Sequence, residues 1–223
     1  MSDGNAQGID VSHYQGTVSW AEVRQAGIEF AFAKATDGLT WVDPQFAANW
    51  PGMQAAGILR GAYHFFEPAD DASQQAQFFL STVQLAAGDL PPALDVEKAA
   101  SSSTALWQGV ETWLQDVAAA TGLQPFLYVA PTFARDKGIP EALAAYPLWI
   151  AEYGVTQPAL PTGWTAWQIW QHSESGSVAG VTGTVDLDVA SGPIASLLAL
   201  THAANTKATP GPAGKGRGFW HAR

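Results

Sequence analysis

Strand-like and helix-like hydrophobic patterns alternate along the chain, starting at residue 8 and ending near residue 202. Short runs that are apolar at nearly every position are typical of strands covered on both faces. Longer segments with apolar residues three and four positions apart are typical of amphipathic helices. Predicted strands occupy residues 8–11, 28–35, 58–66, 92–97, 125–130, 147–151, 166–171 and 184–189.

Helices are predicted between most of these strands. The most regular one covers residues 103–121, with Leu106, Val110 and Trp113 on one face and Gly122 as its end. A helix that opens at Asp43 should be kinked or split by Pro51, because proline lacks the amide proton that a helix interior needs. The other predicted helices cover residues 18–26, 70–87 and 193–202, with a weaker stretch up to about residue 145.

This alternation of strands and helices favours an α/β fold built on a parallel sheet. Eight strands in 223 residues leave about 28 residues for each strand–helix unit, which is at the lean end for such a repeat. Residues 146–190 hold three predicted strands with almost no room for helices between them. If the sheet closes into a barrel, its second half should therefore be irregular.

Composition and charge narrow the class of protein. Hydrophobic residues make up 47% and charged residues 13%, and there is no cysteine, which excludes a disordered chain, a coiled coil and a disulfide scaffold. No apolar run reaches the roughly 18 residues of a membrane helix, so we expect no membrane insertion. The net charge of −10 argues against nucleic acid as a partner.

The composition also divides the chain into three parts. Residues 1–7 form an N-terminal extension, residues 8–202 a single domain, and residues 203–223 a basic tail rich in Gly, Pro and Lys. The extension has no basic segment followed by an apolar stretch, so it is not a secretory signal. We expect synthesis in the cytoplasm.

Polar and aromatic residues gather at the carboxyl ends of the predicted strands. In barrels and open α/β sheets this edge is where sites are built. Asp10 closes the first strand, Asp95 and Glu97 close the fourth, and Asp186 and Asp188 close the last. Other candidates at or near strand ends are Lys34, Tyr63, Phe65, Tyr128, Trp149 and Gln171.

The segment Asp95-Val96-Glu97 is the strongest single candidate for chemistry. Residues two apart on a strand point to the same face, so the two carboxyl groups should project together. Mutual repulsion raises the pKa of one of them, leaving one acid and one anion. Cleavage of a glycosidic bond needs this pair: a proton donor for the leaving oxygen and an anion facing the oxocarbenium charge.

Other chemistries find little support in the sequence. His13 and His64 lack the spacing of a metal-binding set, so we expect hydrogen-bonding roles and no metal. No phosphate-binding glycine loop and no G-x-S-x-G nucleophile motif follows a strand, and we expect no cofactor. Aromatic rings near the strand ends suit a carbohydrate groove, although core packing explains a part of them equally well.

An ordered series of segments resembles glycoside hydrolase family 25 lysozymes, the Chalaropsis-type N-acetylmuramidases. The resemblance begins with Gly8-Ile9-Asp10-Val11-Ser12-His13-Tyr14 and extends to about residue 200. Its further segments are Phe30-Ala31-Phe32-Ala33-Lys34-Ala35-Thr36, Gly61-Ala62-Tyr63-His64-Phe65, Leu94-Asp95-Val96-Glu97, Leu148-Trp149-Ile150-Ala151, Trp170-Gln171 and Val185-Asp186-Leu187-Asp188. The order of the series makes the resemblance specific.

This resemblance implies an irregular (β/α) TIM-like barrel with eight strands and fewer helices. It implies hydrolysis of the β-1,4 bond between N-acetylmuramic acid and N-acetylglucosamine in peptidoglycan. Glu97 would be the general acid, Asp95 would stabilise the transition state or a substrate N-acetyl nucleophile, and Asp10 and Asp186 would complete the catalytic acids. Substrate-binding residues would be Tyr63, Tyr128, Phe65, Lys34, Trp149, Gln171 and Asp188. The acid at Asp188 departs from the asparagine common in the family.

Peptidoglycan glycan strands are the expected partner, and we expect a monomer. The enzyme would act on the cell wall after release or delivery, as a phage endolysin or a secreted effector. Two alternatives stay open: a catalytically silent glycan-binding barrel, and a chitin-type glycosidase on the same fold.

Overall fold

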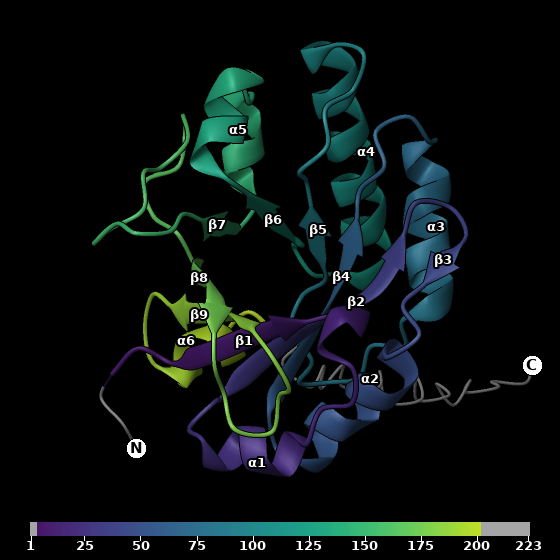
Figure 1. Cartoon of the computed structure of the whole chain (residues 1–223). Coiled ribbons are helices and arrows are strands. Elements are labelled where there is room, and N and C mark those ends of the chain that lie inside the picture. The colour runs from purple at the N-terminus through teal and green to yellow at the C-terminus, as the bar shows by residue number, and fades with distance from the viewer. Residues whose placement is uncertain (1–3, 202–223) are drawn as a thin grey trace, which may run out of the picture.

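The computed structural model describes residues 4–201, which form one closed barrel surrounded by helices (Figure 1). The sheet order is β1-β9-β8-β7-β6-β5-β4-β2-β3, and pairing between β1 and β2 closes it. Eight strands make the barrel, and the short β3 is added to the edge of β2 as an antiparallel hairpin. The irregular TIM-like barrel with fewer helices than strands is thus confirmed.

The strands are close to the predicted ones. Their bounds are β1 (Gln7–Val11), β2 (Phe30–Asp37), β3 (Trp41–Val42), β4 (Leu59–Phe65), β5 (Ala93–Asp95), β6 (Phe126–Val129), β7 (Leu148–Ala151), β8 (Ile169–Gly176) and β9 (Val185–Ala190). The α-helices of the described residues are α1 (Trp20–Gln25), α2 (Phe46–Ala55), α3 (Ala72–Thr82), α4 (Ser103–Thr121), α5 (Pro131–Asp136) and α6 (Ile194–Leu198). Two 3-10 helices, His13–Gln15 and Glu141–Ala145, complete the secondary structure.

The expectation of a wholly parallel sheet is wrong for the last strand. β9 runs antiparallel to both of its neighbours, β1 and β8. The reason is the short connection from β8, residues 177–184, which contains no helix and returns the chain as a hairpin. The first residues of β9, and not its last ones, therefore lie at the carboxyl end of the parallel strands.

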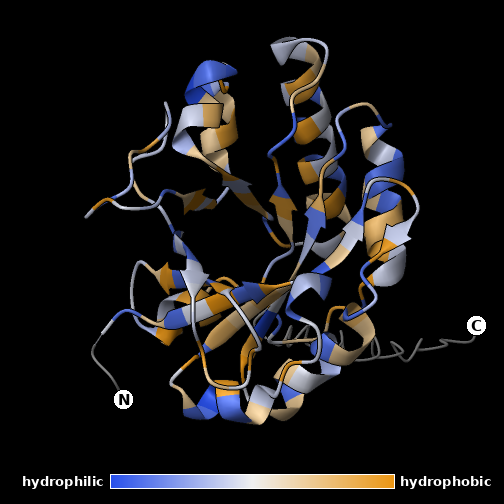
Figure 2. Cartoon of the chain, in the orientation of Figure 1, coloured by the Kyte–Doolittle hydropathy of each residue, from blue (hydrophilic) through white to orange (hydrophobic). Residues whose placement is uncertain are grey.

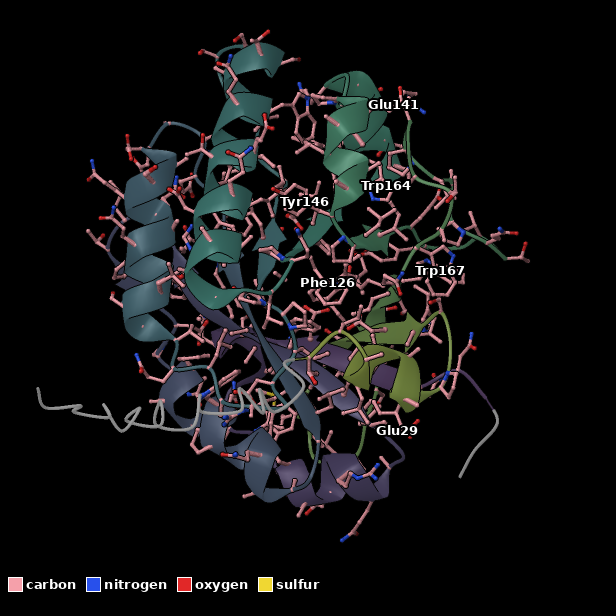
Figure 3. The ribbon with its side chains drawn as sticks, turned by 180° about the vertical axis from the view of Figure 1, so that it is seen from behind. Glu29, Phe126, Glu141, Tyr146, Trp164 and Trp167 are labelled. Atoms are coloured by element: carbon pink, nitrogen blue, oxygen red, sulfur yellow. The ribbon has the colours of Figure 1, made fainter. Side chains whose placement is uncertain are left out.

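Two apolar layers hold the fold together. One fills the barrel and includes Phe30, Phe32, Phe126 and Trp149, and the other lies between the strands and the surrounding helices. Figure 2 shows hydrophobic residues along the strands, and Figure 3 shows side chains crowding around Phe126. The interior is tightly filled, since a Cβ added at Gly61 would lie 2.2 Å from the Phe32 ring. The barrel is therefore a packed core with a site only at its mouth.

Four predictions about the bounds of strands and helices need correction. Ala6 is fully buried, donates its N–H to Gly192 O and accepts from Ala190 N, so the barrel starts before the predicted residue 8. The second helix is not split, because α2 continues through Pro51. α3 and α6 are shorter than the predicted helices 70–87 and 193–202. The predicted basic tail, residues 203–223, lies outside the described residues.

Helices α3 and α4 pack side by side, with α3 also against β2 and α4 against β5 (Figure 1). α4 occupies the predicted residues 103–121, with a side-chain cap at Ser102 and a left-handed Gly122 at its end. Within residues 4–201, no helix combines the length and apolar character needed to cross a bilayer.

Candidate active site

A cavity of about 200 Å³ opens at the carboxyl end of the parallel strands. Ten of the eleven predicted site residues line it: Asp10, Lys34, Tyr63, Phe65, Asp95, Glu97, Tyr128, Trp149, Gln171 and Asp186. Because these residues come from strands β1, β2, β4, β5, β6, β7, β8 and β9 or their ends, only barrel closure brings them together.

Asp95 and Glu97 lie at the end of β5. Asp95 is the last residue of the strand and is buried, whereas Glu97 follows the strand and is exposed. Backbone bonds continue past the strand end, from Phe66 N to Asp95 O and from Val96 N to Tyr128 O. These bonds hold the segment extended, so both carboxyl groups border the same cavity.

The environments of these two carboxyl groups differ. Burial, followed by the charge of Glu97, raises the pKa of Asp95 well above its ordinary value, and Lys34 acts against this. Desolvation against the cavity wall raises the pKa of Glu97, while hydrogen bonding to Tyr128 and the charges of Lys34 and Lys98 lower it. The site therefore offers a solvent-accessible acid above a buried carboxyl group.

Gln171 links three strands beneath the cavity. Its Oε1 accepts from the Tyr128 hydroxyl at 2.9 Å and from the Tyr153 hydroxyl at 2.5 Å. Its Nε2 donates to Asp10 Oδ2 at 2.6 Å. Because both tyrosine hydroxyl groups donate to the amide oxygen of Gln171, its amide nitrogen faces Asp10. This N–H group in turn orients the Asp10 carboxyl group.

Asp186 and Asp188 occupy different levels of the barrel. Antiparallel pairing sets Asp186 opposite Asp10 and Asp188 opposite Gly8. Asp186 therefore borders the cavity, where burial raises its pKa to about 6. Asp188 lies below and is 1% exposed, with Oδ1 accepting from Trp149 Nε1 at 2.8 Å. The prediction that Asp188 belongs to the substrate-binding surface is wrong. Because β9 runs antiparallel to β1, residue 188 lies further from the mouth of the barrel than residue 186 and is buried.

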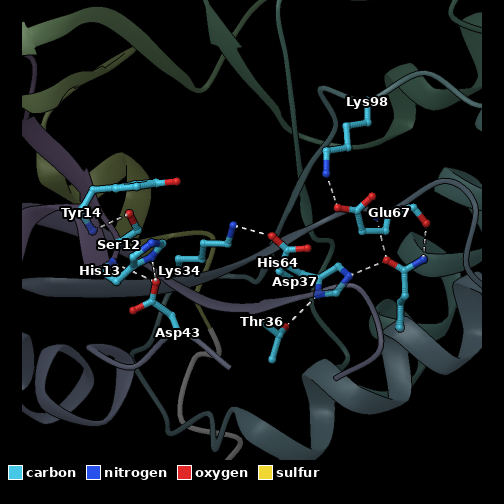
Figure 4. Close-up of polar contacts among 11 residues, drawn as sticks. Ser12, His13, Tyr14, Lys34, Thr36, Asp37, Asp43, His64, Glu67 and Lys98 are labelled. Carbon is cyan, nitrogen blue, oxygen red and sulfur yellow. Dashed lines mark hydrogen bonds and ion pairs between the residues drawn. The ribbon is translucent and has the colours of Figure 1, made fainter. Parts of the chain in front are cut away.

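An irregularity in β2 separates two polar residues that a regular strand would place on one face. The register between β2 and β4 shifts between Lys34 and Thr36. Lys34 borders the cavity, 4.3 Å from the Phe65 ring, and pairs with Asp37 at 2.8 Å. Thr36 is buried and contacts His64 (Figure 4). Because of this register shift, the ammonium group of Lys34 borders the cavity, whereas Thr36 is directed away from it.

The two predicted hydrogen-bonding histidines have such partners. His13 Nδ1 lies 2.9 Å from Asp43 Oδ2 at the rim of the site (Figure 4). His64 lies between Thr36 Oγ1, at 2.8 Å, and Gln75 Oε1, at 3.0 Å, and stacks on Trp113.

Four lining residues were absent from the predicted set: Val11, Ser12, Tyr14 and Gln15. Val11 is the last residue of β1 and the other three follow it, where Ser12 and Gln15 form a capping box around the short helix His13–Gln15. Tyr14 is 83% exposed and stands at the edge of the cavity. The S-x-x-Q spacing after the first strand was the available signal for this turn.

Comparisons with known proteins identify the family of the chain. The family described as "Glycosyl hydrolases family 25" matches residues 9–181. Lysozyme M1 from Streptomyces globisporus is 38% identical over 211 residues, covering 88% of this chain and 71% of that protein. The uncharacterized protein YegX of Escherichia coli (strain K12) is 41% identical over 198 residues, covering 86% and 72%.

Solved structures give the same result. The crystal structure of the bacterial lysozyme from Streptomyces coelicolor matches with a TM-score of 0.84 at 36% identity, covering 90% of this chain and 98% of that one. A family GH25 lysozyme from Aspergillus fumigatus matches with a TM-score of 0.80 at 29% identity, covering 88% and 99%.

The barrel and its acidic mouth thus define a glycoside hydrolase. The chain belongs to glycosyl hydrolases family 25 and is an enzyme of the lysozyme type, which hydrolyses peptidoglycan.

Proposed function

We propose that this enzyme cleaves the β-1,4 bond between N-acetylmuramic acid and N-acetylglucosamine, with Glu97 as the general acid. The observation that carries the proposal is the pairing of exposed Glu97 with buried Asp95 in one cavity at the barrel mouth. The raised pKa of Glu97 keeps a larger share of that group protonated near neutral pH than an ordinary glutamic acid. Glu97 donates this proton to the oxygen of the leaving sugar.

Asp95 acts on the sugar that keeps the reacting carbon. Its Oδ1 is buried in the cavity wall and has no hydrogen-bond partner among the described residues. An N–H group of the substrate suits this oxygen, and an N-acetyl sugar carries one beside its reacting carbon. Asp95 then orients the acetamido group, whose oxygen attacks that carbon as the glycosidic bond breaks. Water completes the hydrolysis, and Glu97 regains its proton.

The test is digestion of purified peptidoglycan by the wild type and by Glu97→Gln, with mass analysis of the reducing ends. We expect muramic acid ends from the wild type and a loss of at least about 1,000-fold in the variant, because the amide cannot donate the proton. Glu141→Gln is a matched control, since Glu141 is exposed on the 3-10 helix Glu141–Ala145 and lies outside the cavity.

Other results favour the alternatives. Glycan binding without new reducing ends would favour a catalytically silent barrel. N-acetylglucosamine ends, with faster turnover of chitin than of peptidoglycan, would favour a chitin-type glycosidase. Equal activity of wild type and Glu97→Gln would show that another group supplies the proton.

A further inference from the structure

Asp188 is a buried carboxyl group that the proposed reaction does not use. It lies on β9 beneath the cavity, with one oxygen bound by the Trp149 indole N–H at 2.8 Å. The other oxygen, Oδ2, receives no N–H or O–H donor from any residue between 4 and 201. Strand pairing sets Asp188 opposite Gly8, so Asp10, two residues further along β1, is its diagonal neighbour on the same face of the sheet, and the two carboxyl groups interact there.

The groups nearest this pair are acidic or neutral; Lys34 of β2 borders the same cavity but pairs with Asp37. Asp10 already accepts from Gln171 of β8 and lies directly opposite Asp186 of β9. Asp95 on β5, Tyr63 on β4 and Tyr128 on β6 face the same interior. In the part of the chain that the structure describes, no lysine or arginine forms an ion pair with Asp10, Asp186 or Asp188.

Two ionised carboxylates repel each other and have only acceptors to offer, so a hydrogen bond between them requires a proton. We propose that Asp10 and Asp188 share a proton beneath the cavity, and that Asp188 is thereby a positioning residue that holds the Asp10 carboxyl group in place. This inference rests on the proposed function for the role of Asp10 as a site acid. The shared proton itself does not depend on that role.

The electrostatics agree with the geometry. Burial, together with the charge of Asp186, raises the pKa of Asp188 to about 8. Burial and the charges of Asp188 and Asp186 raise that of Asp10 well above its ordinary value. The pair therefore retains a proton at neutral pH, although the proton belongs to the pair and not to one residue.

The first test measures proton linkage in the folded enzyme. A carboxyl group whose pKa is raised on folding stabilises the folded state fully below its unfolded-state pKa, and this stability is lost as the pH rises toward the folded value. Asp188→Asn supplies an N–H to Asp10 and does not titrate. Between pH 5 and pH 7 we expect the folded-to-unfolded ratio to fall about 100-fold more in the wild type than in Asp188→Asn.

Chemical unfolding at both pH values gives this ratio. Asp136→Asn is the control, because Asp136 is an exposed carboxyl group on α5, outside the cavity. It should show the same pH dependence as the wild type. Equal pH dependence in wild type and Asp188→Asn would overturn the proposal, since Asp188 would then carry no proton in this range.

The second test separates positioning from packing. Asp188→Leu is of similar size but forms no hydrogen bond to Asp10 or Trp149. We expect Asp188→Asn to retain at least about tenfold more kcat than Asp188→Leu; equal values would contradict a positioning role. If the wild type releases no muramic acid ends at any pH, the proposed function fails, whereas the unfolding comparison still decides the question of the proton.

Discussion

At the scale of single residues, the site depends on polar side chains that orient the acids from below. Gln171 connects two tyrosine hydroxyl groups to Asp10, and the Trp149 indole N–H holds Asp188. Each acid thus receives its own neutral donor instead of a cation. Neutral donors fix the direction of a carboxyl group without removing the raised pKa that burial produces.

Replacing Gln171 by leucine should therefore affect the site more than the fold. The change removes the donor to Asp10 and leaves two tyrosine hydroxyl groups without their acceptor. We expect kcat to fall by at least about tenfold and the free energy of unfolding to fall by about 1–3 kcal/mol. Steady-state kinetics on peptidoglycan and urea unfolding measure the two effects.

Gln168→Leu is the matched control. Gln168 lies at the opposite end of the barrel, where its backbone N–H bonds to Leu148 O. Similar losses of kcat in both variants would show that Gln171 has no special role at the site.

At the scale of elements, one buried histidine connects the barrel to its helices. His64 of β4 contacts Thr36 of β2, Gln75 of α3 and the Trp113 ring of α4. Gln75 Nε2 donates to the carbonyl groups of Glu67 and Asp70, so its Oε1 faces His64 as an acceptor. His64 Nε2 therefore carries the proton, and Nδ1 accepts from the Thr36 hydroxyl.

Acid should weaken this connection. Burial lowers the pKa of His64 to about 4, so the neutral form is the one that folding favours. The resulting stability is present above the ordinary pKa of 6.5 and is lost as the pH falls toward 4. Between pH 6.5 and pH 4.5 we expect His64 to lower the folded-to-unfolded ratio of the wild type about 40-fold.

Comparison with His64→Gln isolates this contribution, because glutamine keeps hydrogen-bonding groups but does not titrate. The measurement is denaturant unfolding at the two pH values. His172→Gln should retain most of the wild-type acid response, since His172 is only partly buried and the lowering of its pKa by burial is small beside that of His64. An identical acid response in wild type and His64→Gln would contradict the prediction.

At the scale of the whole molecule, the net charge is negative, so the protein as a whole is not attracted to an anionic cell wall. The chain has 20 acidic and 10 basic side chains, with a net charge of −10. Recognition must then depend on contacts within the cavity and its rim, including exposed Tyr14. Attraction over long distances has no part in it.

Activity should therefore respond weakly to ionic strength. Raising NaCl from about 20 mM to about 200 mM should change the initial rate of wall digestion by less than about twofold, because salt screens an attraction that this enzyme does not use. Turbidity of a cell-wall suspension measures the rate. A steep loss of activity over this range would show that basic groups capture the wall.

Much of the barrel was predictable because its strands are buried on both faces and so are apolar throughout. The helix at residues 103–121 was predicted to the residue, since Gly122 and a regular apolar spacing mark it. The direction of the last strand was missed. The lack of room for a helix before it favours a hairpin, but the direction itself depends on which strands become neighbours when the barrel closes. Because the strand is antiparallel, its first residues lie at the mouth of the barrel, so Asp186 borders the cavity and Asp188 does not.

The sequence by itself determined the local choices: which segments are strands, where α4 starts and ends, and which strand ends carry acids. These follow from side-chain spacing and from turn and cap residues, which act over a few positions. Only the tertiary structure decided how far each carboxyl group is buried and which donor it meets. Those properties arise because barrel closure joins residues as distant as Asp10 and Gln171, and the pKa of a buried acid depends on its neighbours in space and not on those in sequence.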